Sequence, residues 1–343
     1  MNSKSLTRQS NFELLRIFCM LGIITGHALQ SLYDLHTPNF SVINTVQIAL
    51  MNACVVGVNC FILISGYFRI RQSWKGFLNL YLQLLFYACI SALVCLWLRP
   101  DQSLLVSLKR IAFPLTESGL WFIATYVGLY LVSPLLNAAF DKQDSRQRTV
   151  TLAMLLIADV YIGYMHQTEE VTINGYHLIH FIVMYYLGVW LSEHKSLIIN
   201  IKWGGVWLLV ILLNTGLHAI KMVFLPIAII YSMRYNSPMN MLATISFFCW
   251  AMTWKLQSGF VNKVGVSVLA VYICSEFFPV YYGPLHWIQT EFAGWGEFVL
   301  IPLFIITFLF ACVLFDKLRI WITTPLVSRL SQIMESVSRK VIK

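Results

Sequence analysis

Ten long apolar runs follow one another along the chain, separated by short polar segments. Their approximate ranges are 12–30, 42–66, 77–98, 120–139, 149–165, 178–192, a run that starts near residue 203, 239–254, 264–281 and 297–315. A helix needs about 20 mostly apolar residues to cross a bilayer. The runs are continuously apolar and do not alternate with polar positions, as the strands of a membrane barrel do. The pattern predicts an all-α fold, a polytopic membrane helix bundle of about ten transmembrane helices.

The composition agrees with this prediction. Of the 343 residues, 58% are hydrophobic and 11% are charged, whereas soluble domains carry roughly a quarter charged residues. The net charge is +9, but the basic residues are dispersed among the connections, so we expect the lipid bilayer as a partner and no nucleic acid. The eight cysteines lie in apolar runs without a CxxC pair. We interpret them as small buried residues and predict no metal site.

The distribution of lysine and arginine predicts the orientation in the membrane. If the N-terminus is cytoplasmic and the region 203–232 crosses once, most basic connections lie inside and the acidic ones lie outside. Lys109 and Arg110 are the exception. This scheme places both termini in the cytoplasm and makes about 221–233 an interfacial or re-entrant segment.

We expect one integral membrane domain over residues 1–316, followed by a basic amphipathic cytoplasmic tail over 317–343. An apolar stripe runs along the tail and consists of Leu326, Leu330, Ile333, Val337 and Val341. Two interpretations stay open. The tail either lies as a helix on the anionic cytoplasmic leaflet or is a solvated end.

The first apolar run, "NFELLRIFCMLGIITGHAL", contains two residues that do not suit a lipid-facing helix, Arg16 and His27. At about 100° per residue, eleven steps place both on one face, about 16 Å apart along the axis. Glu13 lies one turn before Arg16 and can pair with it. Gly22 and Gly26 allow close approach to the backbone.

Ionisable groups inside a bilayer are costly and normally face a cavity or the bundle interior. The shared face therefore points to a functional pair. Two simpler interpretations stay open: Arg16 only reaches toward the cytoplasmic headgroups, and His27 is a buried hydrogen-bonding histidine.

Further motifs follow in order along the chain. They read "VNCFILISGYF", "LWFIATYVGLYLVSPLLN", "FIVMYYLGVWL" and "VNKVGVSVLAVYICSE". Together with "RIFCMLGIITGH", they resemble the acyltransferase-3 family of integral membrane acyltransferases in its stand-alone form, over most of the chain to about residue 280. Two departures exist. Ser275 stands where many members have a histidine, and Arg69-Ile70-Arg71 does not have the Arg-x-x-Arg spacing of some members.

The resemblance implies a multi-pass enzyme of the bacterial plasma membrane. Such an O-acyltransferase moves an acyl group, usually acetyl, from cytoplasmic acyl-CoA to a sugar hydroxyl of a surface polysaccharide or its lipid-linked precursor. Acyl-CoA is then a donor substrate, and we expect no permanently bound cofactor. His27 suits a general base, because imidazole has an unperturbed pKa near 6.5, and it can instead carry the acyl group itself. Arg16, paired with Glu13, can bind phosphate or carbonyl oxygens of the donor.

Other candidate residues fall into two sets. The predicted acyl-CoA-binding set is Arg69, Arg71, Lys75, Asn59, Ser65 and Tyr67. The predicted acceptor-binding set is Trp121, Tyr126, Tyr272 and Glu276. Topology signalling, helix–helix hydrogen bonds and interfacial anchoring are the competing interpretations of these residues. His177, His180 and Asp159 are ranked below Arg16 and His27.

The main alternative function is a transporter or flippase of a lipid-linked glycan. Such proteins often show inverted repeats and broken helices, and the sequence shows neither clearly. A glycan polymerase would need larger extracytoplasmic loops.

Overall fold

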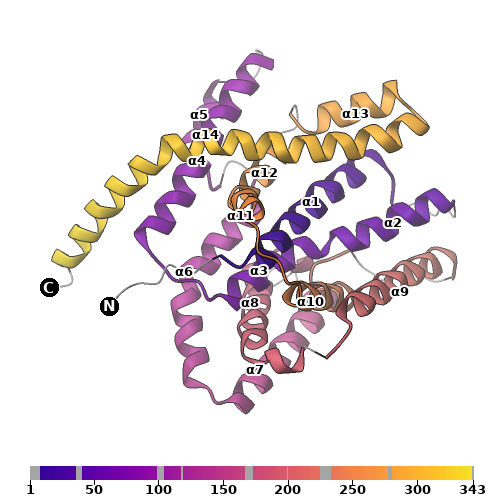
Figure 1. Ribbon diagram of the computed structural model, residues 1–343, viewed down its shortest axis with the longest axis horizontal. Helices are drawn as coiled ribbons and strands as arrows, with labels where there is room; N and C mark the ends of the chain where they lie inside the picture. Colours follow the sequence, from indigo (N-terminus) through magenta and orange to yellow (C-terminus); the bar gives the residue numbers. More distant parts are fainter. Residues whose placement is uncertain are drawn as a thin grey trace. The chain divides into compact units, whose positions relative to one another are not determined.

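The computed structural model describes residues 8–35, 41–98, 104–116, 119–166, 173–198, 200–224, 233–276 and 280–341. All regular secondary structure within these ranges is helical (Figure 1), so the predicted all-α class is confirmed. In chain order the α-helices are α1 (Ser10–Leu32), α2 (Val42–Cys54), α3 (Val56–Tyr67), α4 (Trp74–Leu98), α5 (Leu104–Ala112), α6 (Trp121–Lys142), α7 (Ser145–Ala158), α8 (Leu178–Glu193), α9 (Trp203–Phe224), α10 (Pro238–Met252), α11 (Gly259–Gly265), α12 (Val268–Ser275), α13 (Tyr282–Glu291) and α14 (Trp295–Val341). A π-helix, η1 (Asp159–Met165), continues α7, and short 3₁₀ turns form η2 (Ile173–Gly175) and η3 (Lys195–Leu197).

The helices coincide with the predicted membrane spans. Among the described residues, seven helical segments are long and apolar enough to cross a bilayer: Ser10–Leu32, Val42–Tyr67, Trp74–Trp97, Trp121–Lys142, Ser145–Met165, Trp203–Ile220 and Trp295–Lys340. Three shorter apolar segments are Leu178–Glu193, Pro238–Met252 and Gly259–Ser275. Each of the ten predicted runs has its helical segment here. The chain is therefore a polytopic membrane helix bundle.

Polar side chains fix where several helices begin. Ser41, Ser237 and Ser258 each accept a hydrogen bond from a backbone N–H in the first turn of α2, α10 and α11. At the start of α7, Asp144 and Gln147 form a reciprocal capping box. Such caps satisfy N–H groups that have no partner inside the helix, so they mark the polar boundaries between apolar runs.

The helices form two compact units. The first comprises Met1–Arg69 and Leu136–Val268. Its centre is α3, which packs against α8, α1 and α10, while α1 also contacts α2 and α11. Figure 1 shows α1 and α2 side by side. The core of α3 is Val58, Cys60, Ile62, Leu63 and Ile64, all buried.

The second unit comprises Ile70–Leu135 and Leu269–Lys343. Here α4 packs against both α14 and α5, and α13 packs against α14. Lys109 and Arg110, the exception to the predicted charge distribution, lie in the last turn of α5.

Two predicted segments, the region from residue 203 and the C-terminal tail, can be compared with the observed helices. The region from residue 203 forms a single helix through Phe224, whereas most of the predicted interfacial segment, about 221–233, lies outside the described residues. The last helix, α14, continues without a break from the predicted tenth span through the predicted tail, over 47 residues. The boundary expected at residue 316 is therefore not an interruption of the helix. Attachment of the tail to the cytoplasmic leaflet stays a prediction.

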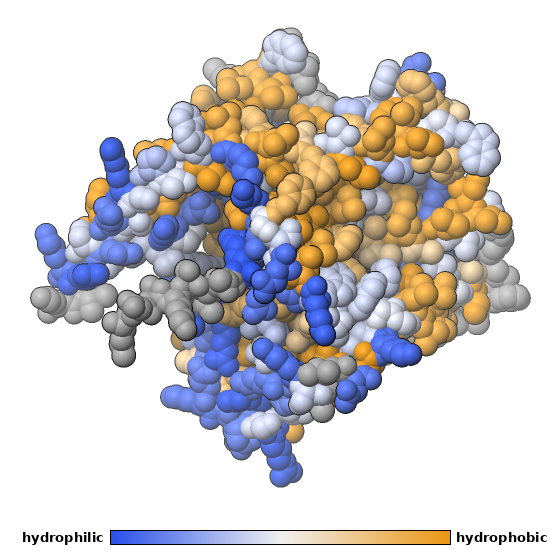
Figure 2. Space-filling model, in the orientation of Figure 1, coloured by the Kyte–Doolittle hydropathy of each residue, from blue (hydrophilic) through white to orange (hydrophobic). Residues whose placement is uncertain are grey.

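Apolar residues cover wide areas of the face shown in Figure 2, as contact with lipid requires. On α9, for example, Leu208, Leu209, Leu212 and Leu213 are exposed. Hydrophilic residues gather at the bottom of the same view, where α6 is followed by α7 (Figures 1 and 2). The exposed connection there runs from Asp141 to Arg146.

Candidate functional site

Glu13 anchors the first turns of α1. Its carboxylate Oε1 lies 2.7 Å from Arg16 Nη1 and 3.3 Å from Arg8 Nη1. The predicted pairing of Glu13 with Arg16 is thus confirmed. The Glu13 side chain is 5% exposed and the Arg16 side chain 30% exposed. Gly265 of α11 packs so closely on Glu13 that a side chain at residue 265 would overlap the carboxylate. A buried carboxylate therefore holds a guanidinium that is still accessible.

The position of His27 follows from the continuity of α1. The helix runs unbroken from Ser10 to Leu32, so Arg16 and His27 share a face and lie about 16 Å apart along the axis. His27 is half-buried. At this distance the two side chains cannot act on the same atom.

Glycines bring α2 and α3 onto α1. A Cβ on Gly22 would lie 3.3 Å from the Cys54 carbonyl oxygen, and one on Gly57 would lie 2.7 Å from the Cys19 carbonyl oxygen. The predicted close approach at Gly22 and Gly26 is therefore made by another helix, α2.

Two of the motifs quoted from the sequence meet in space. Gly66, in the Ser-Gly motif of α3, lies against the backbone of Tyr185 and Gly188, in the Tyr-Tyr-x-Gly motif of α8. A Cβ on Gly188 would lie 3.1 Å from the Gly66 Cα. These glycines allow backbone-to-backbone packing at the centre of the first unit.

Asn59 belongs to a buried polar triad with His180 and Asp159. All three are at most 1% exposed. His180 Nε2 lies 2.9 Å from Asn59 Oδ1, and His180 Nδ1 lies 2.6 Å from Asp159 Oδ2. Asn59 Nδ2 donates to the Tyr235 carbonyl oxygen at 2.8 Å, which fixes the orientation of the amide.

This orientation identifies the donor in the contact between Asn59 and His180. Asn59 Oδ1 can only accept, so His180 Nε2 carries a hydrogen. His180 Nδ1 contacts Asp159 Oδ2, so the imidazole bridges the amide and the carboxylate. The sequence gives no reason to favour His180 and Asp159 as site residues, because their spacing does not show that their side chains come into contact.

Two further predicted donor-binding residues of the first unit, Ser65 and Tyr67, lie near the C-terminal end of α3. Ser65 Oγ donates to the Phe61 carbonyl of its own helix at 2.9 Å. The Tyr67 ring lies 4.8 Å from the Phe12 ring and 5.1 Å from Lys195 Nζ. Tyr67 therefore combines an aromatic contact with a cation at the polar end of the bundle.

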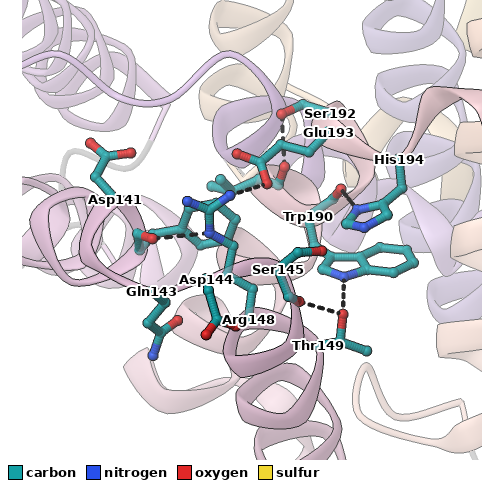
Figure 3. A network of polar contacts seen from close by, with 12 residues as sticks. Asp141, Gln143, Asp144, Ser145, Arg148, Thr149, Trp190, Ser192, Glu193 and His194 are labelled. Atoms are coloured by element: carbon teal, nitrogen blue, oxygen red, sulfur yellow. Dashed lines mark hydrogen bonds and ion pairs between the residues drawn. The ribbon is translucent and has the colours of Figure 1, made fainter.

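Arg69 takes part in an ion-pair network at the helix ends. Its guanidinium lies 2.5 Å from Asp141 and 3.4 Å from Glu193. Arg148 Nη1 lies 2.7 Å from the other oxygen of Glu193, and Arg148 Nε donates to the Phe140 carbonyl oxygen in the last turns of α6 at 3.2 Å (Figure 3). Both guanidinium groups also lie over the Phe140 ring. The network joins the ends of α3, α6, α7 and α8.

Arg71 and Lys75 belong to the second unit and are exposed. The structure thus separates the three cations predicted to bind acyl-CoA into one that is paired and two that face outward. Their role in donor binding stays a prediction.

Three of the four predicted acceptor-binding residues gather around Phe122 in the second unit. The Phe122 ring lies 6.0 Å from Trp121, 6.0 Å from Tyr126 and 5.9 Å from Tyr272. Glu276 follows one turn after Tyr272 and is half-buried. Phe122 was missed because an aromatic residue in an apolar helix carries no distinguishing signal.

Comparison with known proteins identifies the family. Residues 9–317 match the family model described as an acyltransferase domain. No curated protein and no solved structure gave a significant match. The matched region contains α1 with Arg16 and His27, the α3–α8 contact and the aromatic group around Phe122. The chain therefore belongs to the acyltransferase-3 family and is a multi-pass membrane acyltransferase.

Proposed function

We propose that this protein is an O-acyltransferase of the bacterial plasma membrane. It moves an acetyl group from cytoplasmic acetyl-CoA to a sugar hydroxyl of a cell-surface polysaccharide or its lipid-linked precursor. The observation that carries the proposal is the geometry of α1. An accessible arginine, anchored by a buried glutamate, shares a helix face with a histidine about 16 Å away.

The separation assigns different tasks to the two groups. Arg16 binds phosphate or carbonyl oxygens of the donor through its planar fork. His27 acts where the thioester meets the alcohol. It takes the proton of the sugar hydroxyl while the hydroxyl oxygen attacks the thioester carbonyl carbon. The new C–O bond forms, the C–S bond breaks, and the proton passes to the departing thiolate to give free coenzyme A.

A second route uses the same atoms in two steps. His27 attacks the thioester, coenzyme A leaves, and the acyl-imidazole then transfers its acyl group to the sugar hydroxyl. Rapid quenching with labelled acetyl-CoA in the absence of acceptor distinguishes the routes. Label retained on His27 supports the two-step route, and its absence supports direct transfer.

Mutation of His27 tests the proposal. We expect His27→Ala to abolish transfer of label from acetyl-CoA to glycan by the purified protein in lipid nanodiscs. The matched control is His166→Ala, because His166 is exposed at the end of η1; its transfer rate should equal that of the wild type. Unchanged transfer by His27→Ala would reject His27 as the essential group.

The acceptor is identified in the producing strain. Mass spectrometry and NMR of surface glycans from a deletion strain should show the loss of one ester class. The wild-type gene should restore that ester, and the His27→Ala gene should not. Identical glycans in the deletion and wild-type strains would contradict a surface-glycan acceptor.

A further inference from the structure

Two turns that lie far apart in the sequence are joined in the first unit. Residues 174–177 precede α8, and residues 233–237 precede α10. The Tyr235 N–H donates to the Asn174 carbonyl oxygen at 3.0 Å. A Cβ on Gly175 would lie only 2.7 Å from the Tyr235 Cβ, so the two turns are in direct contact. We call residues 174–177 and 233–237 the paired turns.

Buried amides hold the paired turns from inside the bundle. Asn59 Nδ2 of the buried triad donates to the Tyr235 carbonyl oxygen at 2.8 Å. Asn240 Nδ2 donates to the Arg234 carbonyl oxygen at 3.0 Å. Asn174 has a φ of 57°, a left-handed conformation that asparagine adopts more readily than most residues. The paired turns therefore have a fixed backbone, which lowers the entropic cost of binding a ligand on them.

The paired turns lie level with His27 along α1. Tyr235 and Met233 pack against a buried apolar cluster that contains Leu29 of α1 and Met51 of α2. Leu29 is two residues from His27, about 3 Å along the helix axis. In the predicted orientation this end of α1 is extracytoplasmic. The paired turns thus belong to the same compact unit as His27 and lie on the side from which a surface saccharide reaches the protein.

The paired turns carry an aromatic pair. The rings of Tyr176 and Tyr235 lie 5.2 Å apart with an angle of 65° between their planes. Tyr176 is 42% exposed, and Tyr235 is half-buried. A tyrosine side chain combines an apolar ring face with a polar hydroxyl. A sugar ring has an apolar C–H face and hydroxyl groups at its edge, so its two parts match the two parts of tyrosine.

Two polar side chains next to the aromatic pair each have an unsatisfied atom. Asn174 Oδ1 and His177 Nδ1 have no hydrogen-bond partner among the described residues, and native structures seldom leave such atoms unsatisfied. Both residues are half-buried, so rotation of the amide or of the imidazole can turn these atoms toward a ligand. A sugar hydroxyl suits both atoms, because it donates as well as accepts.

We propose that the paired turns bind a sugar ring of the acceptor saccharide. The Tyr176–Tyr235 pair covers the C–H face of the ring. Asn174 and His177 form hydrogen bonds with its hydroxyl groups. This assignment rests on the proposed function, since it takes a saccharide as the acceptor. It adds, in the unit that contains His27, a binding surface to the predicted acceptor-binding set of the second unit.

Kinetics with both substrates test the assignment. The acceptor probe is a set of oligosaccharides released from the surface polysaccharide of a deletion strain, and the donor is labelled acetyl-CoA, with the full chain in nanodiscs. We expect Tyr176→Ala to raise KM for the oligosaccharides about tenfold, the effect of losing one aromatic contact. KM for acetyl-CoA should not change. Tyr176→Phe keeps the ring and should resemble the wild type.

Asn174→Gly tests the hydrogen-bonding part of the surface. Glycine accepts a φ of 57°, so the turn keeps its backbone and only the amide is lost. We expect KM for the oligosaccharides to rise about fivefold, the effect of losing one hydrogen bond. KM for acetyl-CoA should again stay at the wild-type value.

Tyr161→Ala is the matched control, because Tyr161 is an exposed tyrosine of η1 in the same unit; both KM values should equal those of the wild type. If Tyr161→Ala and Tyr176→Ala raise KM for the oligosaccharides equally, these tyrosines only anchor the protein at the membrane surface, and the assignment is overturned.

The wild type separates this assignment from the proposed function. If the wild type transfers label to the oligosaccharides and neither Tyr176→Ala nor Asn174→Gly raises their KM, the assignment is wrong and the proposed function stands. If Tyr176→Ala raises both KM values and Asn174→Gly raises neither, the paired turns only stabilise the fold, and the assignment is likewise wrong. If the wild type transfers no label to the oligosaccharides, the proposed acceptor is wrong and the assignment falls with it.

Discussion

Individual residues of α1 show what spacing can reveal. The eleven-residue interval between Arg16 and His27, and the three-residue interval between Glu13 and Arg16, have a fixed geometric meaning within one helix. The Asn59–His180 contact joins residues 121 positions apart, and no local rule predicts such a contact. Asp316 and Arg319 of α14 form an ion pair at 2.9 Å. Their three-residue spacing suits such a pair, but both follow the last predicted span, where a charged pair is common.

Arg16 is expected to act on donor binding more than on the chemical step. Arg16→Gln should raise KM for acetyl-CoA about tenfold or more and change kcat less, because the guanidinium binds a part of the donor remote from the reacting atoms. Arg8→Gln is the control. Arg8 contacts the same carboxylate oxygen at 3.3 Å, but its side chain is 50% exposed, so its loss should change KM little. Steady-state kinetics over a range of acetyl-CoA concentrations checks both; equal effects of the two substitutions would contradict a special role for Arg16.

The buried triad should be important for stability. Asp159→Asn replaces the buried carboxylate that contacts His180 at 2.6 Å with a neutral amide, so the buried imidazole loses a charged hydrogen-bond partner. We expect the free energy of unfolding to fall by about 3–5 kcal/mol. Asp144→Asn is the control, because Asp144 is an exposed N-cap and asparagine caps equally well. Unfolding in mild detergent, followed by circular dichroism, gives both values. Equal stability of the two variants would exclude an ionic role for Asp159.

At the scale of elements, hydropathy located every span but not its internal breaks. All ten apolar runs are found as helical segments, because length and apolarity are what a bilayer selects. The interruption at Val55 between α2 and α3, and the π-helix after Ala158, were not predicted. Such breaks depend on contacts with neighbouring helices. The continuation of α14 past residue 316 was missed because amphipathic and spanning helices differ in hydropathy but not in backbone conformation.

Because α3 and α8 touch through glycines, we expect the free energy of unfolding to fall when a side chain is added at their contact. Gly188→Ala places a Cβ against the Leu63 carbonyl and 3.1 Å from the Gly66 Cα. Either the helices separate or the backbone shifts, so we expect a loss of about 1–3 kcal/mol in the free energy of unfolding.

Gly216→Ala is the matched control for this substitution. Gly216 lies in α9 with nothing within 4 Å of the added Cβ. In a helix interior this change should instead stabilise by about 0.5–1 kcal/mol. Opposite signs in thermal unfolding support the contact. Equal and small effects would show that α3 and α8 adjust freely.

For the whole molecule, the distribution of lysine and arginine predicts the orientation in the membrane, which the positions of the helices alone do not test. With both termini in the cytoplasm, the connection between α6 and α7 is inside and the connection between α13 and α14 is outside. Ser145 and Ala293 are exposed positions in these two places.

Labelling of single introduced cysteines tests this orientation. In intact cells, a membrane-impermeant thiol reagent should label Ala293→Cys and should label Ser145→Cys only after the cells are opened. The eight native cysteines are buried or half-buried, and the wild type provides their background. Labelling of Ser145→Cys in intact cells would invert the scheme.

Direct backbone contact at Gly66 and Gly188 also bears on motion. Helices that meet through side chains can slide, because rotamers change to accommodate small displacements. Where two backbones touch, no rotamer is available to absorb a shift. We therefore expect α3 and α8 to travel as one rigid body during turnover. Any opening that admits a thioester must then come from helices whose neighbours are held by side chains.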